Sequence, residues 1–547
     1  MLLDTSIDFG AGGADIVAQI IIDEVHKRTL VTWRVNDARA ANHVSLSLNP
    51  GMSHAEKYVI ARRDAQHYVI EGKTTRALIY GAGKFMRCLE LGYPQEYDTP
   101  YTPTIRMKSD VTFPISSTPA YTWRGHQIAY RPKTHNYDAL TSEQMQQEIL
   151  DQVLFGCNVI EMIPPKLDDC QQSPHFTEPW TERLSKMSAW CDLLDVKVSM
   201  WYPAFPGADW RETYKSMKRF DILFIPGGDP GGRAAPEFFR IVREHAHVVR
   251  EYFPDVEIWV SSQYGLAMSP DLDLKPWNPK EKLEEFYQHV PLNLDLLNGI
   301  VYGPWTADEP KEFRRRIPKE LPIRHYPDLC HNLKSQHIVG PRWDFPFAAT
   351  YCRESINPRP RYYAHVFRTD MPHFRYGSGC YSEGSGDDVN KAVWTGMLWG
   401  ETDERRIMDE YAEWFIGTRE AAPLIFALED NWAKPLRSGQ VVATLKQVLE
   451  LAQTLPQRAE RNWRWQMIYF RAVCDAYLYV RQYGDRANRS LEWPLPGTSH
   501  VPWRTKHPKK KTSSKFFLPS EMALFGKLEA THGILYALIG MQFAVVR

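Results

Sequence analysis

Three carboxylates stand directly after short apolar runs of the sequence: Asp229, Asp328 and Glu383. Each run has the length and the β-branched or aromatic content of a buried strand. A pair of carboxyl groups at strand ends can divide the roles of acid and base, or of acid and nucleophile, between them. These three residues are therefore the candidate catalytic groups.

Aromatic side chains accompany the carboxylates at the predicted strand ends. The chain holds 18 Trp, 27 Tyr and 24 Phe, and aromatic residues make up 13% of it. The aromatic residues at strand ends are Trp201, Tyr202, Tyr264, Trp305 and Tyr381. A ring offers an apolar face to the C–H groups of a sugar, and a carboxylate pair is the usual apparatus for cleaving a glycosidic bond. The combination predicts a carbohydrate substrate.

Five polar residues near the same strand ends are candidates for contacts with the substrate. They are Arg124, His126, Arg131, His331 and Asp388. Arginine can bind a carboxylate through two parallel hydrogen bonds, so the arginines would suit a sugar that carries a carboxyl group.

The elements that would position these residues alternate between strand-like and helix-like segments from Tyr121 to about Thr402. The predicted strands are Trp123–Tyr130, Val159–Pro164, Val196–Tyr202, Asp221–Pro226, Val256–Ser261, Gly299–Tyr302, Ile323–Tyr326 and Ser378–Ser382. The helices predicted between them are Glu143–Phe155, Glu182–Leu194, Trp210–Arg219, Ala235–Tyr252 and Lys280–His289. Eight such units predict a (β/α)8 TIM barrel over residues 120–402, with its reactive groups where the strands end. The stretch between the last two strands, Cys330 to Tyr376, reads as loop-rich.

Two further regions flank the predicted barrel. Residues 1–115 read as a small α+β domain, in which the segment Tyr68–Leu91 is expected to form strand, turn, strand and then a helix opened by Gly81. Residues 403–547 read as a C-terminal helical region with a basic tail, which is interpreted as a solvated surface segment. The fold class is therefore α/β, with a barrel between two smaller parts.

The overall composition narrows the partners. The 66 Lys and Arg balance 66 Asp and Glu, which argues against nucleic acid and membrane surfaces as partners. The eight cysteines show no zinc-binding spacing and no disulfide framework, and no cofactor or metal is expected. The location is left open, as cytoplasmic for the sequence as written or as secreted or periplasmic if a leader was removed. Oligomeric state is also left open, with a homo-oligomer among the options.

Parts of the sequence resemble known glycoside hydrolases. The segments YVIEG at residues 68–72 and ALIYGAGKF at residues 77–85 resemble the zincin-like domain that precedes the barrel in family 20 β-hexosaminidases. The same domain occurs in α-glucuronidases of families 67 and 115, whose three-part layout this chain resembles most, over about residues 1–480. The segments WRGHQIAYRPKTHNYDA, YPDLCH, INPRP and YSEGSGDDVNK look like those of bacterial proteins with this layout.

The resemblance also shows a departure at the fourth strand. Family 20 enzymes carry an adjacent Asp-Glu pair there, whereas this chain has Asp229 followed by Pro230, so proline replaces the expected acid. By analogy with the α-glucuronidases, Asp229 would be the acid, with Asp328 or Glu383 as the base. The opposite assignment is equally open, with Glu383 as the acid and Asp229 or Asp328 as the base.

The sequence thus predicts an exo-acting glycoside hydrolase that removes a terminal sugar, an acidic or N-acetylated one among the candidates, by carboxylate acid/base catalysis. Inversion of the anomeric centre is favoured, and the substrate would be an oligosaccharide or a glycoconjugate. Pro230 motivates one alternative, a non-catalytic carbohydrate-binding barrel. A retaining enzyme like the β-N-acetylhexosaminidases is a second alternative, and a metal-dependent hydrolase or lyase that uses His126, His331 and the Asp residues is a third.

Overall fold

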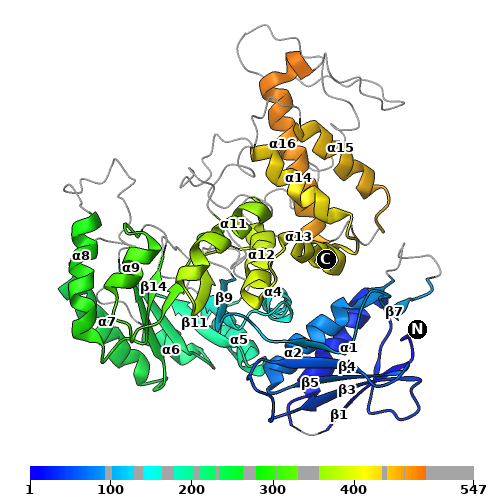
Figure 1. Cartoon of the computed structure of the whole chain (residues 1–547), viewed down its shortest axis with the longest axis horizontal. Coiled ribbons are helices and arrows are strands. Elements are labelled where there is room, and N and C mark those ends of the chain that lie inside the picture. The colour runs from blue at the N-terminus through cyan, green and yellow to red at the C-terminus, as the bar shows by residue number, and fades with distance from the viewer. Residues whose placement is uncertain are drawn as a thin grey trace.

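The computed structural model spans the chain, and part of the chain is described here. The described residues are 1–10, 12–92, 101–128, 140–162, 178–202, 210–227, 233–262, 279–303, 306–330, 356–382, 384–433, 440–456, 459 and 462–487. They form an N-terminal α+β unit, a closed barrel and a group of C-terminal helices (Figure 1).

The N-terminal unit is built on a mixed six-stranded sheet in the order β2-β1-β3-β5-β4-β8. The strands are β1 (Thr5–Phe9), β2 (Arg34–Val35), β3 (Asn42–Leu48), β4 (Tyr58–Arg62), β5 (His67–Gly72) and β8 (Ile115–Ser117). Helices α1 (Asp15–Thr29) and α2 (Thr75–Arg87) pack together on this unit. Strands β6 (Leu89–Leu91) and β7 (Ile105–Met107) form a separate antiparallel pair.

One predicted element of this unit is wrong. The run Ala77–Tyr80 was expected to be a strand, with a helix opening at Gly81, but the whole run lies inside α2. The helix begins earlier because the Thr74 hydroxyl caps it by accepting the backbone N–H of Ala77 at 3.2 Å. Gly81 marks close packing instead, since a Cβ there would lie 2.7 Å from Cγ2 of Ile70 on the sheet.

The barrel closes in the order β10-β11-β12-β13-β14-β15-β16-β9, with every neighbouring pair parallel. Its strands are β9 (Trp123–Gln127), β10 (Val159–Met162), β11 (Lys197–Trp201), β12 (Ile222–Pro226), β13 (Glu257–Ser261), β14 (Gly299–Tyr302), β15 (Ile323–His325) and β16 (Gly377–Cys380). The predicted fold class is confirmed. All eight strands coincide with predicted ones to within a few residues at their ends.

Helices surround the barrel in the described residues. They are α4 (Ser142–Leu154), α5 (Trp180–Leu193), α6 (Arg211–Ser216), α7 (Ala235–Arg250), α8 (Pro279–His289), α9 (Pro310–Arg316), α11 (Pro360–Asp370) and α12 (Asp388–Trp399). Helix α4 begins with a capping box, in which Thr141 and Gln144 satisfy each other's backbone N–H groups. Helix α11 lies within the stretch from Cys330 to Tyr376 that the sequence indicates to be loop-rich.

The C-terminal helices are α13 (Glu404–Tyr411), a π-helical turn η4 (Ala412–Ile416), α14 (Ala421–Ala433), α15 (Gln440–Ala452) and α16 (Trp463–Ala487). Figure 1 shows α14, α15 and α16 gathered beyond α12. Among the helices that the structure describes, none has the length and apolar character needed to cross a membrane.

A buried charge cluster joins these helices to the barrel. Arg464 of α16 bonds through Nε and Nη2 to Asp388 of α12, at 2.7 and 3.0 Å, and through Nη1 to Asp151 of α4 at 2.9 Å. Tyr411 of α13 also donates to Asp388, at 2.6 Å. The three charged residues are at most 5% exposed, so each depends on the others for its solvation.

This cluster generates a stability prediction. The variant Arg464→Leu leaves two buried carboxylates without a counter-ion, and we expect it to lower the free energy of unfolding by about 3–5 kcal/mol. The measurement is urea denaturation followed by circular dichroism. Arg315→Leu is the matched control, because Arg315 pairs with Glu312 on the surface, where such a pair contributes about 0–1 kcal/mol. Equal effects of the two variants would contradict the prediction.

Candidate active site

The strands of the barrel direct alternate side chains inward, and these fill its interior. The inner cluster consists of Trp123, Val159, Trp201, Ile222, Phe224, Trp259, Val301, Tyr326, Cys330 and Tyr381. Trp201 and Tyr381 therefore face the barrel interior, but only 2% and 8% of their surfaces are exposed. They pack against other rings there, and the proposed contact with sugar is untested for both.

A carboxylate is buried among these rings. Glu161, inward-facing on β10 and 3% exposed, accepts hydrogen bonds from Gln127 Nε2 at 2.9 Å and Ser199 Oγ at 3.1 Å. It also accepts from Arg324 Nη2 at 2.9 Å and Tyr326 OH at 2.8 Å. Four donors, from β9, β11 and β15 with the residue that follows it, fill the acceptor capacity of its two oxygens. Glu161 therefore holds the barrel wall together and has no free lone pair with which to take a proton from a substrate.

Arg324 is the counter-ion of Glu161 and lies in an aromatic box. Its guanidinium carbon is 4.6 Å from the ring centroid of Trp123, 4.8 Å from Phe224 and 5.1 Å from Tyr326. Its Nε and Nη1 have no hydrogen-bond partner in the described part of the chain. The ring faces and the charge of Glu161 are thus its main stabilisation. Gly379 leaves room for the guanidinium of Arg324, since a Cβ at position 379 would overlap Nη1 of Arg324.

The network continues upward to the end of β16. The side-chain oxygen of Gln127 accepts the backbone N–H of Ser382 at 3.2 Å. The Ser382 hydroxyl donates to Asp387 at 3.0 Å and accepts the backbone N–H of Gly384 at 3.2 Å. The two residues that flank position 383 are thus both held by buried hydrogen bonds.

Asp328 stands at the end of the neighbouring strand. It forms an isolated parallel bridge with Tyr381, which extends the pairing of β15 with β16 by backbone hydrogen bonds of 2.9 and 3.0 Å. Its side chain accepts the backbone N–H of Cys330 at 3.0 Å, and its backbone oxygen accepts the Tyr363 hydroxyl at 3.0 Å. Asp328 is half-buried. Of the three predicted catalytic carboxylates, it is the one that lies within the described residues.

Several predicted site residues lie outside the described residues. They are Asp229, Glu383, Arg131, Tyr264, Trp305 and His331. Their roles remain predictions.

The structure places Arg124 and His126 on the outer side of β9, and this corrects their predicted contact with substrate. Arg124 is fully buried and binds Glu56 of the N-terminal unit through Nη2 and Nη1, at 2.8 and 3.1 Å. His126 is hydrogen-bonded to Thr395 of α12. Burial lowers the pKa of His126 well below its usual range, so the ring is neutral. Strand alternation is the cause, since Trp123 and Gln127 occupy the inward positions.

Tyr202 and Asp388 are corrected in the same way. Tyr202 lies outside the barrel wall, with its ring centroid 4.8 Å from that of His245 on α7, and its hydroxyl 3.2 Å from Thr213 of α6. The carboxylate of Asp388 accepts hydrogen bonds from Arg464 and Tyr411 in the buried charge cluster described above. Both are therefore structural residues.

A metal centre has no support in the described residues. No group of three or more His, Cys, Asp or Glu residues there could hold a metal ion. His126, which the metal-dependent alternative invoked, faces α12 instead.

Sequence reasoning missed Glu161, Gln127 and Arg324. It selected residues near the strand ends without knowing which side of the strand faces inward, whereas these three lie within strands at inward positions. The available signal was a charged residue inside an otherwise apolar run, as in Val159–Met162. Such a residue must be paired when it is buried.

Comparisons with known proteins bear on the fold. Neither the protein-family models nor the curated proteins compared with this sequence give a match. Among solved structures, a family 89 glycoside hydrolase from Clostridium perfringens in complex with PUGNAc has a TM-score of 0.53 at 9% identity. The match covers 87% of this chain and 63% of that one. The GH20 β-N-acetylhexosaminidase from Streptomyces coelicolor A3(2) has a TM-score of 0.49 at 12% identity, over 75% of this chain and 91% of that one. At 9% identity the likeness to the family 89 structure shows a shared fold.

The buried pair Glu161 and Arg324 generates a double-mutant prediction. We expect Glu161→Met or Arg324→Met alone to lower the free energy of unfolding by about 3–5 kcal/mol, because each leaves an uncompensated buried charge. The double variant should recover most of that loss, since it replaces both charges with apolar groups of similar length. Chemical denaturation of the four proteins gives the coupling energy. Additive losses would contradict the prediction.

Proposed function

We propose that this protein is an exo-acting glycoside hydrolase that uses carboxylates at the barrel mouth as acid and base. Glu383, Asp229 and Asp328 are the proposed catalytic residues. The fold supports the proposal, because the solved structure with the higher TM-score of the two described above is a glycoside hydrolase in complex with PUGNAc. Active sites of (β/α)8 barrels lie at the ends of the strands, where all three carboxylates stand.

The arrangement of the strands supports a wide separation between two of these carboxylates. In the closed order, β12 and β16 are four strands apart in a ring of eight and therefore lie opposite each other. Asp229 follows β12 and Glu383 follows β16. Carboxyl groups about 6.5–9.5 Å apart leave room for a water between base and sugar, which suits inversion. We propose Glu383 as the acid and Asp229 as the base.

Asp328 follows β15, the neighbour of β16. Its bridge to Tyr381 brings it alongside the chain two residues before Glu383. We propose that its charge supports the acid form of Glu383, because a nearby like charge disfavours ionisation. Asp328 is also the alternative base. The experiment below distinguishes the two assignments through the size of each loss.

In this proposal, side chains near Asp328 bind the terminal sugar. Arg359 lies in the INPRP segment, and its Nη2 donates to the Tyr363 hydroxyl at 2.7 Å. That hydroxyl in turn contacts the backbone of Asp328. We propose that Arg359 binds an acidic or acetamido substituent of the sugar. It takes the role that the sequence predicted for Arg124.

The first functional prediction concerns the catalytic carboxylates. Glu383→Gln and Asp229→Asn should each lower kcat by about 10²–10⁴-fold on the best aryl glycoside of a panel that includes uronides and acetamido sugars. Asp328→Asn should cost less if it acts on the acid, and as much if it is the base. Glu312→Gln, on the surface of α9, is the matched control. Hydrolysis of no glycoside in the panel, or normal turnover by Glu383→Gln, would refute the proposal.

The second functional prediction concerns stereochemistry. We expect the first sugar released to have the anomeric configuration opposite to that of the substrate, because opposite strands separate acid from base. Proton NMR of the product within the first minutes, before mutarotation, makes the measurement. Release with the original configuration would indicate a retaining mechanism and overturn the assignment of Asp229 as the base.

A further inference from the structure

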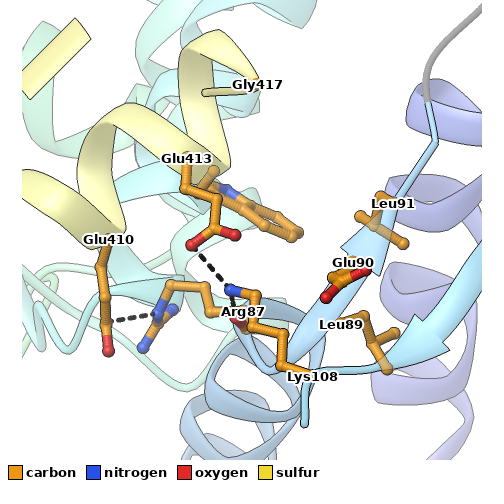
Figure 2. Close-up of a pocket in the computed structure, with 9 residues that line it drawn as sticks. Arg87, Leu89, Glu90, Leu91, Lys108, Glu410, Glu413 and Gly417 are labelled. Carbon is orange, nitrogen blue, oxygen red and sulfur yellow. Dashed lines mark hydrogen bonds and ion pairs between the residues drawn. The ribbon is translucent and has the colours of Figure 1, made fainter. Parts of the chain in front are cut away.

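A pocket lies between the N-terminal unit and the C-terminal helices, lined by none of the residues at the barrel strand ends. It has a volume of about 200 Å³ and is bounded by the β6–β7 pair on one side and by α13 and η4 on the other (Figure 2). That volume is below the range of about 300–1,000 Å³ typical of sites for drug-sized molecules. The pocket therefore has room for a ligand of single-sugar size.

The wall formed by the C-terminal helices depends on the π-helical turn. The backbone N–H of Gly417 donates to the oxygen of Ala412 at 3.0 Å, a five-residue bond that widens the helix, and Gly417 ends it with a φ of 95°. This turn brings Glu413 and Trp414 to the pocket lining. Arg28 stacks 3.7 Å from the ring centroid of Trp414 and holds the indole in place. Single π-turns of this kind are frequent at functional sites.

Charges of both signs line the pocket. Lys108 Nζ donates to the backbone oxygen of Arg87 at 2.5 Å and pairs with Glu413 Oε2 at 2.8 Å. Arg87 Nε pairs with Glu410 at 3.2 Å, and Glu90 pairs with Arg106. Figure 2 shows Lys108 and Glu413 meeting across the pocket, with Glu90 and Leu91 on the facing strand. Two cations and three carboxylates thus surround one small space.

These ion pairs do not use every hydrogen-bond donor and acceptor of the pocket lining. Among the described residues, one N–H of Lys108 and the Nη2 group of Arg87 have no partner, and Oε1 of Glu413 and of Glu90 accept no hydrogen bond. Each carboxylate of the lining is already paired with a cation outside the lining, Glu410 with Lys84, Glu413 with Arg419 and Glu90 with Arg106, so the pocket holds no uncompensated charge for an ionic ligand. A neutral ligand with adjacent hydroxyls can use all four groups, because each hydroxyl both donates and accepts. Leu91 supplies apolar surface for its C–H groups, and Trp414, which is 5% exposed, contributes only the part of its ring that lines the pocket.

We propose that this pocket is a binding site for a single neutral sugar residue, separate from the barrel mouth. The site would hold a saccharide by a contact that involves no bond cleavage. It goes beyond the proposed hydrolysis, because binding here uses none of the residues placed in that reaction.

Calorimetric titration of the full chain with glucose, galactose and mannose tests the proposal. We expect a Kd on the order of 1 mM for at least one of them, and weaker binding of glucuronate and glucosamine. Leu91→Trp fills the pocket without breaking an ion pair and should weaken binding at least about tenfold. Glu413→Gln should weaken it several-fold. Leu292→Trp, at an exposed leucine elsewhere, is the matched control.

Three outcomes would overturn the proposal: no binding of any neutral sugar, binding that Leu91→Trp leaves unchanged, or equal binding of the charged sugars. Unchanged binding in Leu91→Trp would assign the sugar to another site, such as the barrel mouth. Circular dichroism and the thermal midpoint of each variant show that it is folded. Repeating the titration with Glu383→Gln separates this site from catalysis, because that variant should bind the sugar here with unchanged affinity.

Discussion

The ion pair between Glu161 and Arg324 is the interaction on which the interior of the barrel depends. It joins β10 to β15 across the lumen, and its remaining hydrogen bonds reach β9 and β11. Two charges removed from water are tolerable only when each is fully compensated. Four donors compensate the carboxylate, and the carboxylate with three aromatic rings compensates the guanidinium. The same network extends through Gln127 to Ser382, so the geometry of the last strand end depends on a charge buried near the barrel axis.

The outer face of the barrel wall follows a similar rule. Polar side chains on the outer side of the strands and on the surrounding helices are directed at neighbouring elements. Arg124 binds Glu56 of the N-terminal unit, and Asp388 binds Arg464 of the C-terminal helices. Both flanking regions are thus tied to the barrel by buried ionic contacts. The pocket between these regions exists because the barrel holds them side by side.

The strand positions were predictable because the barrel strands are short apolar runs between helical segments, and eight such runs in parallel order have few other solutions. The helix α2 was harder to predict, since its Ala77–Tyr80 run is as apolar as a strand. Glycines at positions 81 and 83 looked like a helix start, but they serve close packing. Local sequence could not reveal this, because the atoms that demand the glycines belong to Ile70 and Leu154.

The sequence by itself determined the fold class, because the order of strands and helices depends on local periodicity, and it predicted a set of carboxylates at strand ends. Tertiary structure alone decided which polar residues face the lumen. A strand of five residues exposes its side chains to alternate sides, and one step of register exchanges the two sets. Arg124 and His126 therefore lie outside, while Gln127 and Glu161 lie inside. The partners that make buried charges tolerable come from segments far apart in the chain, and only folding brings them together.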